Sequence, residues 1–338
     1  MDTRRKTASV PPPAATSRAA PVAADRVSRV RVGPDSAGQR LDNFLLRLAK
    51  GVPKSHVYRV VRSGEVRVNR GRVGVDHRLE EGDEVRVPPM RVATRQEGPA
   101  PAPAAMPPIL FEDDYLIVVD KPAGWAAHGG SGIAYGLIER VRAARPNQPF
   151  LELAHRLDRE TSGVLILGKT RRALTALHAD MREGRIDKRY FTLVKGDWVN
   201  DRQHVKLPLH KFLTPSGERR VKVDAEQGAP SHTIFNLIER RGDFSLLEAE
   251  LKTGRTHQIR VHLSHQGFPI VGDDKYGDFD LNKRVARGEF GARLERMFLH
   301  AHSVCFVHPV TGQSMHIEAP LAPECADFLK KLGNAHKV

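Results

Sequence analysis

The segment LAHRLDRETSGVLIL, residues 153–167, runs from a charged turn directly into an apolar strand. Polar loops at the end of a rigid strand are common positions for catalytic groups. Within this turn Asp158 is flanked by Arg156 and Arg159, and nearby cations favour the ionised form of a carboxylate. Such a carboxylate can act as nucleophile or base, but clusters of Arg and Asp are also common in structural ion-pair networks. The segment alone leaves both interpretations open.

The surrounding sequence predicts a mixed α+β fold built around a sheet. Apolar runs and alternating patterns predict strands, and spacings of three and four residues predict amphipathic helices. Thr256 is expected to cap the N-terminus of a helix over residues 256–266, and Gly267 is expected to end it. The expected strands are 115–120, 164–169, 188–196, 231–239 and 243–251, the last two as an antiparallel hairpin, and the expected helices are 170–181 and 256–266.

The turn belongs to a series of motifs that resembles a known family. His155, Arg156, Leu157 and Asp158 are followed after two residues by the sequence TSG at 161–163. This pattern is similar to the signature of the RluA-type pseudouridine synthases, and five further segments occur in the order of that family, which makes the combination specific. The five segments are DKPAG at 120–124, HGGSG at 128–132, KRYFTLVKG at 188–196, TGRTHQIRVHL at 253–263 and GDDKYGD at 272–278.

The resemblance implies an isomerase that turns uridine in RNA into pseudouridine without a cofactor or a metal ion. It assigns the catalytic carboxylate to Asp158 and the basic partner of the aspartate to Arg260, with Arg255 as the alternative. It assigns to Tyr190 a ring that stacks on the uracil and a hydroxyl that assists loss of the C5 proton, although an ordinary half-buried tyrosine of a strand is the alternative. It further implies a mixed, mainly antiparallel sheet flanked by helices. The closest similarity is to bacterial enzymes that act on large-subunit (23S) ribosomal RNA, although transfer RNA stays open as a substrate.

Other residues of the motifs are expected to contact the RNA substrate. The resemblance implies that Arg156 holds the target nucleotide extruded from its stack, which a duplex-embedded base requires. Arg255 is a further expected RNA-binding residue of the large domain. Lys121 and His257 are expected either to have a structural role or to position the RNA. One departure from the family pattern is Asp120, where many relatives have Asn before KPAG, and it affects local hydrogen bonding only.

A second resemblance lies near the N-terminus. Between residues 40 and 72 nine Lys or Arg accompany only two acids, and a segregated block of charge suits a surface that follows phosphates. The block contains two short amphipathic helices and the strand segment GEVRVN at 64–69. It resembles the alpha-L RNA-binding motif, which implies that this domain binds RNA. Together with the resemblance of the large domain, the expected partner is ribosomal RNA of the large subunit. The expected phosphate contacts are Arg40, Lys54, Arg59 and Arg62.

These patterns divide the chain into five parts. Residues 1–37 carry seven basic residues with little hydrophobic periodicity up to about residue 35, and they are expected to form a disordered tail. Residues 93–108 are rich in Pro and Ala and are expected to form an extended linker. The expected parts are the tail at 1–37, the RNA-binding domain at 38–92, the linker at 93–108, the catalytic domain at 109–325 and a C-terminal tail at 326–338.

Composition excludes several other classes of protein. The 338 residues include 54 Lys plus Arg and 40 Asp plus Glu, a net charge of +14, which favours a polyanionic partner. Two cysteines cannot form a disulfide framework, and the chain has no apolar run long enough for a membrane span. We therefore expect a cytoplasmic monomer.

Two alternative motifs are also weak. The string from Gly163 to Thr170 matches a phosphate-binding loop, but its four central residues are apolar and predict a strand instead. His257 and His262 are five residues apart, so they would not share one helix face as a zinc pair would. We expect neither a nucleotide triphosphatase nor a metal site.

Overall fold

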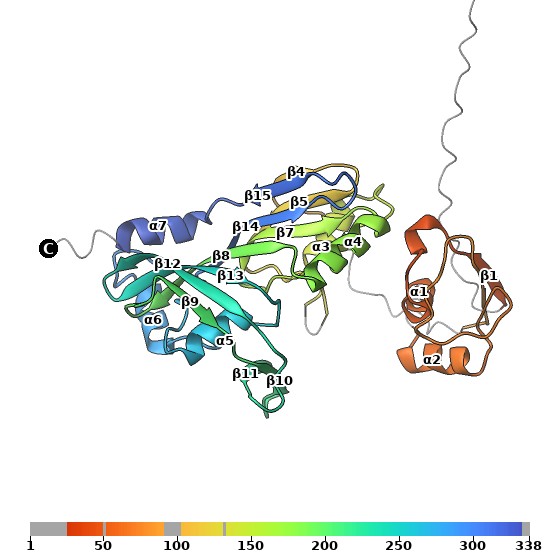
Figure 1. Cartoon of the computed structure of the whole chain (residues 1–338), viewed down its shortest axis with the longest axis horizontal. Helices are drawn as coiled ribbons and strands as arrows, with labels where there is room; N and C mark the ends of the chain where they lie inside the picture. Colours follow the sequence, from red (N-terminus) through yellow and green to blue (C-terminus); the bar gives the residue numbers. More distant parts are fainter. Residues whose placement is uncertain (1–25, 50–51, 91–102, 131–132, 333–338) are drawn as a thin grey trace, which may run out of the picture. The chain divides into compact units, whose positions relative to one another are not determined.

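The computed structural model describes residues 26–49, 52–90, 103–130 and 133–332. The chain forms two compact units, Met1–Gly98 and Pro99–Val338. Figure 1 shows both units, the smaller one containing α1 and α2 and the larger one built on a long sheet. Among the described residues, no helix is long and apolar enough to cross a membrane, and no group of His, Cys, Asp or Glu side chains is arranged to hold a metal ion.

The small unit packs two helices against a three-stranded sheet. Leu41, Phe44 and Leu45 of the first helix and Val57 and Val60 of the second are buried in one hydrophobic core, as their spacing predicts. The sheet has the order β1-β3-β2, and both pairings are antiparallel. Its elements are β1 (Ser28–Arg31), a short 3-10 helix (Pro34–Ser36), α1 (Leu41–Leu48), α2 (Lys54–Arg62), β2 (Arg67–Val68) and β3 (Glu84–Val87).

The N-terminal tail is shorter than expected. The prediction of a disordered tail over 1–37 is wrong for Ser28–Ser36, because β1 pairs with β3 and places Val30 and Val32 in the core. The arginines that alternate with these valines are exposed, so the basic composition concealed a strand with one apolar face. The expected tail over residues 1–25 lies outside the described residues.

The large unit is built on a ten-stranded sheet in which most strands are antiparallel. The main path is β4-β5-β7-β14-β8-β13-β12-β9, with β15 paired to β14 and β6 paired to β7. Of the strand pairs in the described residues, only β7 and β14 run parallel. Its strands are β4 (Ile109–Glu112), β5 (Leu116–Lys121), β6 (Glu152–Leu153), β7 (Ser162–Gly168), β8 (Asp187–Lys195), β9 (Arg202–Val205), β12 (Thr233–Arg241), β13 (Phe244–Leu251), β14 (Leu299–Val307) and β15 (Ser314–Glu318).

Five helices and a separate hairpin complete the large unit. The hairpin of β10 (Leu209–Leu213) and β11 (Arg219–Val223) projects from the sheet, as Figure 1 shows. Thr170 accepts a hydrogen bond from Ala173 N–H and so caps α4 as its position predicts. The helices are α3 (Leu137–Ala144), α4 (Arg171–Arg182), α5 (Gln258–His265), α6 (Phe279–Arg287) and α7 (Pro323–Leu332).

The structure revises both ends of the expected catalytic domain. Met106, placed in the linker by the prediction, packs against the core of this unit, so the part of the linker at 103–108 belongs to the domain. The predicted C-terminal tail from 326 is wrong up to Leu332, because α7 buries Phe328 and Leu332. The remainder of the linker at 93–102 and the tail at 333–338 lie outside the described residues.

The segment that resembled a phosphate-binding loop is a central strand. Residues 162–168 form β7, and every one of them is buried. Gly163 has a φ of +107°, and a Cβ at this position would lie 2.1 Å from the carbonyl oxygen of Ala301. Only glycine therefore allows β7 to approach β14 this closely, which explains the TSG sequence after the catalytic turn.

Candidate active site

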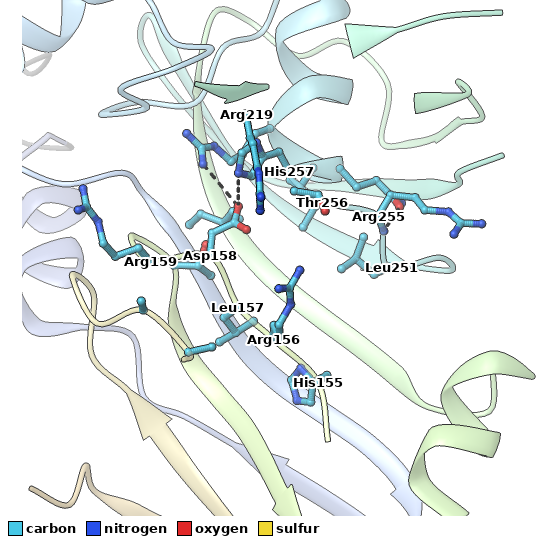
Figure 2. Close-up of a pocket in the computed structure, with 18 of the residues that line it drawn as sticks. His155, Arg156, Leu157, Asp158, Arg159, Arg219, Leu251, Arg255, Thr256 and His257 are labelled. Atoms are coloured by element: carbon cyan, nitrogen blue, oxygen red, sulfur yellow. Dashed lines mark hydrogen bonds and ion pairs between the residues drawn. The ribbon is translucent and has the colours of Figure 1, made fainter. Parts of the chain in front are cut away.

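Asp158 lies on the loop between β6 and β7 and faces a large cleft. Its side chain is 27% exposed, and one oxygen, Oδ2, lies 3.5 Å from Arg260 Nη1 and 3.9 Å from His257 Nε2. Figure 2 shows the Asp158 carboxylate directed toward His257, which precedes α5, and Arg260 lies within α5 itself. The loop itself is closed by a hydrogen bond from Thr161 N–H to the Asp158 carbonyl. Asp158 is thus held at the end of a rigid strand, as the sequence predicts.

Arg260 is held from behind by a second carboxylate. Its Nε and Nη2 donate to the two oxygens of Asp273 at 2.7 and 2.6 Å, and Nη2 also donates to Asp274 at 3.0 Å. Arg260 and Asp273 are buried, and this forked geometry fixes a guanidinium in orientation. Burial raises the pKa of the Asp273 carboxyl, but the hydrogen bonds from Arg260 outweigh it, so that the pKa lies below its usual range. The one arginine atom left toward the cleft is Nη1, which faces Asp158.

His257 links the catalytic loop to the projecting hairpin. Its Nδ1 lies 2.9 Å from the Tyr276 hydroxyl, which accepts a hydrogen bond from Val221 N–H of β11 at 2.9 Å. Burial lowers the pKa of His257, so the ring is neutral at neutral pH. The expected cap at Thr256 is wrong: His257 occupies the cap position with a left-handed φ of +53°. This conformation turns the imidazole toward Asp158 and Tyr276 instead of continuing the helix.

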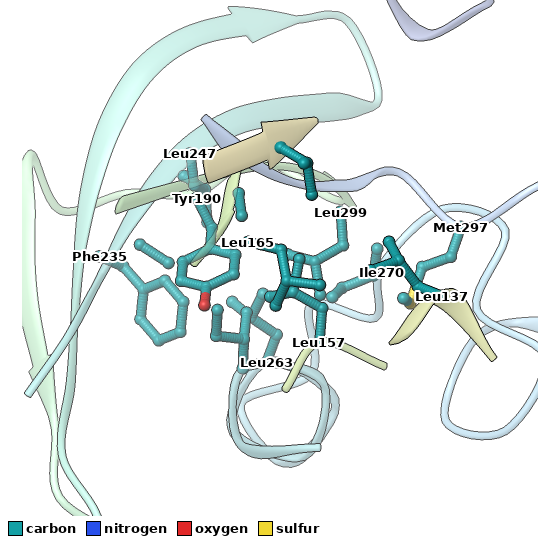
Figure 3. Close-up of a cluster of buried hydrophobic side chains, with 14 of the residues drawn as sticks. Leu137, Leu157, Leu165, Tyr190, Phe235, Leu247, Leu263, Ile270, Met297 and Leu299 are labelled. Atoms are coloured by element: carbon teal, nitrogen blue, oxygen red, sulfur yellow. The ribbon is translucent and has the colours of Figure 1, made fainter. Parts of the chain in front are cut away.

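Tyr190 is part of the hydrophobic core directly beneath the cleft. It lies on β8, is 6% exposed and still contributes to the lining of the cleft. Figure 3 shows its ring beside Phe235 and its hydroxyl near Leu263. Burial, with the charge of Asp158 adding to it, raises the pKa of the phenol. Tyr190 therefore remains protonated across the physiological pH range.

The cleft has the size and charge of a nucleic-acid site. It has a volume of about 1250 Å³ and is lined by segments of several strands, the catalytic loop and the start of α5. Among its described lining residues, nine are Lys or Arg and only Asp158 is acidic. Such an excess of cations attracts a polyanion and leaves one carboxylate at the centre for chemistry.

The expected RNA contacts of the large unit fall into two groups. Arg156 and Arg255 are exposed and line the cleft, where Arg156 Nη1 lies 3.0 Å from His128 Nε2 and Arg255 donates to the carbonyl of Pro230. The prediction that Lys121 contacts RNA is wrong. Its side chain is fully buried and donates to the carbonyls of Pro122, Trp125 and Arg159, so it holds the catalytic loop in place.

In the small unit, the basic residues of α2 share one exposed surface. Lys54, Arg59 and Arg62 are exposed, and the cationic ends of Lys54 and Arg62 lie 5.2 and 6.0 Å from the ring centre of Tyr58. Arg40 differs, because it donates to the buried carboxylate of Asp42 at 2.9 Å. The charge of Arg40 is therefore partly neutralised by Asp42 and is less available to an RNA phosphate than the charges on α2.

Sequence reasoning did not assign roles to Asp273 and Tyr276, although both stand in the quoted segment GDDKYGD. Asp273 orients Arg260, and Tyr276 places its ring 5.2 Å from the Arg260 guanidinium while its hydroxyl joins His257 to the hairpin. Their position beside Arg260 depends on the turn after α5. The sequence indicated only that this segment is rich in polar residues. It did not indicate which of these residues are buried.

Comparison with known proteins identifies the family of both domains. The family model of RNA pseudouridylate synthases matches residues 115–265, and that of the S4 domain matches residues 39–85. The former contains Asp158, Tyr190 and Arg260, and the latter contains both helices of the small unit. This chain belongs to the RNA pseudouridine synthases, which are isomerases, and carries an N-terminal S4 RNA-binding domain.

Individual relatives are similar over nearly their whole length. Ribosomal large subunit pseudouridine synthase C of Escherichia coli (strain K12) is 49% identical over 91% of this chain and 98% of the relative. The protein of the same name from Yersinia pestis is 51% identical over 87% of this chain and 92% of the relative. The solved structure of human RNA pseudouridylate synthase domain containing 4 shares the fold, with a TM-score of 0.54, 23% identity and coverage of 66% of this chain and 92% of that one.

Proposed function

We propose that this enzyme isomerises specific uridines of large-subunit ribosomal RNA, with Asp158 as the essential carboxylate and without a cofactor. The main support is the position of Asp158, which lies at the centre of a strongly cationic cleft and faces a fixed arginine. The ribosomal substrate is supported by the names of the relatives and by the S4 domain.

The reaction breaks the bond between N1 of uracil and the anomeric carbon, rotates the base and forms a bond from that carbon to C5. The proton leaves C5, and N1 gains one, so the product is an isomer. A single carboxylate can assist by attacking the sugar, by adding to the base or by removing a sugar proton. In each case Arg260 acts as a positioning residue, because its Nη1 keeps the Asp158 carboxylate in one orientation.

Tyr190 and Arg156 are assigned to the handling of the base. The pKa of Tyr190 is raised by burial and by Asp158, so its hydroxyl is protonated at neutral pH and is a potential hydrogen-bond donor instead of a phenolate base. We infer that its principal contribution is the ring face beneath the uracil. Arg156 is exposed at the cleft beside His128, where it could hold the nucleotide after extrusion.

The S4 domain is proposed to supply affinity through Lys54, Arg59 and Arg62, since phosphate contacts bind RNA without acting on the reaction centre. We propose that the enzyme works as a monomer in the cytoplasm. In support of a monomer, its exposed large apolar residues lie on separate elements, as for Val199, Leu213 and Phe279.

Mapping of pseudouridines in ribosomal RNA with wild-type and variant protein tests this proposal. Asp158→Asn keeps the size of the side chain and removes its charge, so turnover should fall by roughly 10²- to 10⁴-fold or more while RNA affinity changes little. Glu160→Gln is the matched control, because the ion pair of this neighbouring carboxylate within the described residues is with Arg159 and not with Arg260. Turnover of Asp158→Asn close to that of the control would contradict the assignment.

A further inference from the structure

Lys188 is a cleft cation without an ionic partner. It lies on β8 two residues before Tyr190, and both side chains line the cleft. Within the described residues, Lys188 has no hydrogen bond or ion pair, whereas Arg260 pairs with Asp273 and Lys275 with Glu218. Asp187 is adjacent in sequence, but its carboxylate is bound to Arg189.

Among the described residues no carboxylate oxygen lies within ion-pair distance of Lys188 Nζ, although the charge of Asp187 acts on the ammonium from farther away. A Cβ built on Gly254 would lie 3.8 Å from Lys188 Nζ, so the ammonium faces the loop that precedes α5. His155 is close enough that, after burial, the charge of Lys188 is the next cause that lowers its pKa to about 3. The ring is therefore neutral, and its Nε2 accepts a hydrogen bond from Ile166 N–H. An ammonium between a neutral ring and a glycine still needs a counter-charge.

Burial distinguishes this lysine from the other unpaired cations of the cleft. Arg182 and Arg219 are exposed, so water solvates their charges at little cost, but Lys188 is half-buried. Burial lowers the pKa of Lys188 and the charge of Asp187 offsets only part of this effect, so the charged form is less favoured than in an exposed lysine. A partly buried ammonium without an ion pair is unfavourable in the free enzyme, and its position in a substrate cleft suggests that the bound substrate provides the counter-charge.

We propose that Lys188 binds a backbone phosphate next to the target uridine. Residues i and i+2 of a strand are about 6.6 Å apart, comparable to one nucleotide of backbone, so a base over Tyr190 brings a neighbouring phosphate within reach of Lys188. A lysine suits this task because its ammonium is a compact charge with three donors. The inference rests on the proposed function, since it takes Tyr190 as the platform for the base.

The first test compares three variants of the full-length enzyme on a ribosomal RNA stem-loop that the wild type modifies. Lys188→Met should raise KM roughly ten- to a hundredfold, the usual weight of a charged hydrogen bond, and leave kcat within a few fold. Lys188→Arg should recover most of the lost affinity. Lys331→Met on α7 removes the same charge outside the cleft lining and should change neither constant.

The second test identifies the ligand of Lys188. Methylphosphonate is placed singly at each phosphate that flanks the target, which removes one charge at a time. At one position the wild type should lose affinity and Lys188→Met should lose almost none, and the variant's salt slope should be smaller by about 0.7. Equal profiles for the two proteins at every position would overturn the proposal, as would an unchanged KM in Lys188→Met.

The two proposals fail in different ways. If the wild type modifies the RNA but Lys188→Met binds it equally well, the lysine has no phosphate role and the proposed function stands. If the wild type modifies no ribosomal RNA, the proposed function fails first. Because Lys188 is unpaired and poorly solvated, its replacement by Met should not lower thermal stability, so lost affinity in a stable variant reports on binding.

Discussion

Arg260 contacts two neighbouring aspartates, and burial should make their contributions to stability very different. Asp273 is 1% exposed and accepts two hydrogen bonds from the guanidinium, whereas Asp274 is 55% exposed and accepts one. The substitutions Asp273→Asn and Asp274→Asn each remove one negative charge with almost no change of volume. The pair therefore compares a buried with an exposed ionic partner of the same arginine.

The expected magnitudes follow from this geometry. In Asp273→Asn one amide NH₂ must face a guanidinium N–H, because Oδ1 is already fixed by the N–H groups of Lys275 and Tyr276. Breaking a buried pair costs about 3–5 kcal/mol, and the lower end applies here because Arg260 retains Asp158 and Asp274. Asp274→Asn should cost about 0–1 kcal/mol, as for other exposed pairs.

Denaturant unfolding followed by tryptophan fluorescence measures both changes. The two tryptophans, Trp125 and Trp198, lie in the large unit, so the signal reports on the domain that contains Arg260. Asp273→Asn should also reduce turnover, because Arg260 would no longer fix Asp158. Equal destabilisation by the two substitutions, within about 0.5 kcal/mol, would refute the argument from burial.

The difference between wild type and Asp273→Asn should depend on pH in a defined direction. The pKa of Asp273 is lowered in the folded protein, so its contribution is complete above its unfolded value and is lost as pH falls through the folded value. The unfolding free energies of the two proteins should therefore converge as the pH falls below about 4. A gap that stays constant from pH 7 into this range would contradict the pairing.

Two further predictions concern the hairpin and the S4 domain. Tyr276→Phe keeps the ring beside Arg260 but removes the acceptor of Val221 N–H, so hydrogen exchange at Val221 should accelerate by roughly tenfold or less; unchanged exchange would show that the hairpin is held elsewhere. Deletion of residues 1–98 should raise KM on ribosomal RNA, preserve kcat and flatten the salt dependence by roughly 0.7–0.9 per lost phosphate contact; an unchanged slope would show that the S4 domain does not bind the RNA.

Local patterns were sufficient to predict five of the ten strands of the large sheet and the position of the turn that carries Asp158. The run of apolar residues after Gly163 can only be a buried strand, and this places Asp158 at its start. The same reasoning failed where a pattern was short or concealed. Val30 and Val32 alternate with arginines over only a few residues, and their strand is stable only because β3 lies beside it.

The roles of single charged residues could not be read from the sequence, because they depend on burial and on partners distant in the chain. Lys121 stands in a motif beside basic RNA-binding candidates, yet it donates to the carbonyl of Arg159, 38 residues away. The role of Arg260 was easier to predict, since the family resemblance already pairs this arginine with Asp158. Even there, the resemblance does not reveal the forked contact with Asp273 that determines which guanidinium nitrogen remains for Asp158.

These partners separate the cations of the cleft by function. Arg260 has its charge balanced by the buried Asp273 and the exposed Asp274 before any substrate arrives, so it contributes geometry to Asp158 and little attraction for RNA. In the described residues the Lys188 side chain has no ion pair, and in our proposal its charge is met by a phosphate of the RNA. The cleft needs a fixed carboxylate and also affinity for a polyanion, and positive side chains can provide both. A cation paired with a protein carboxylate orients Asp158, and a cation without such a partner binds a phosphate.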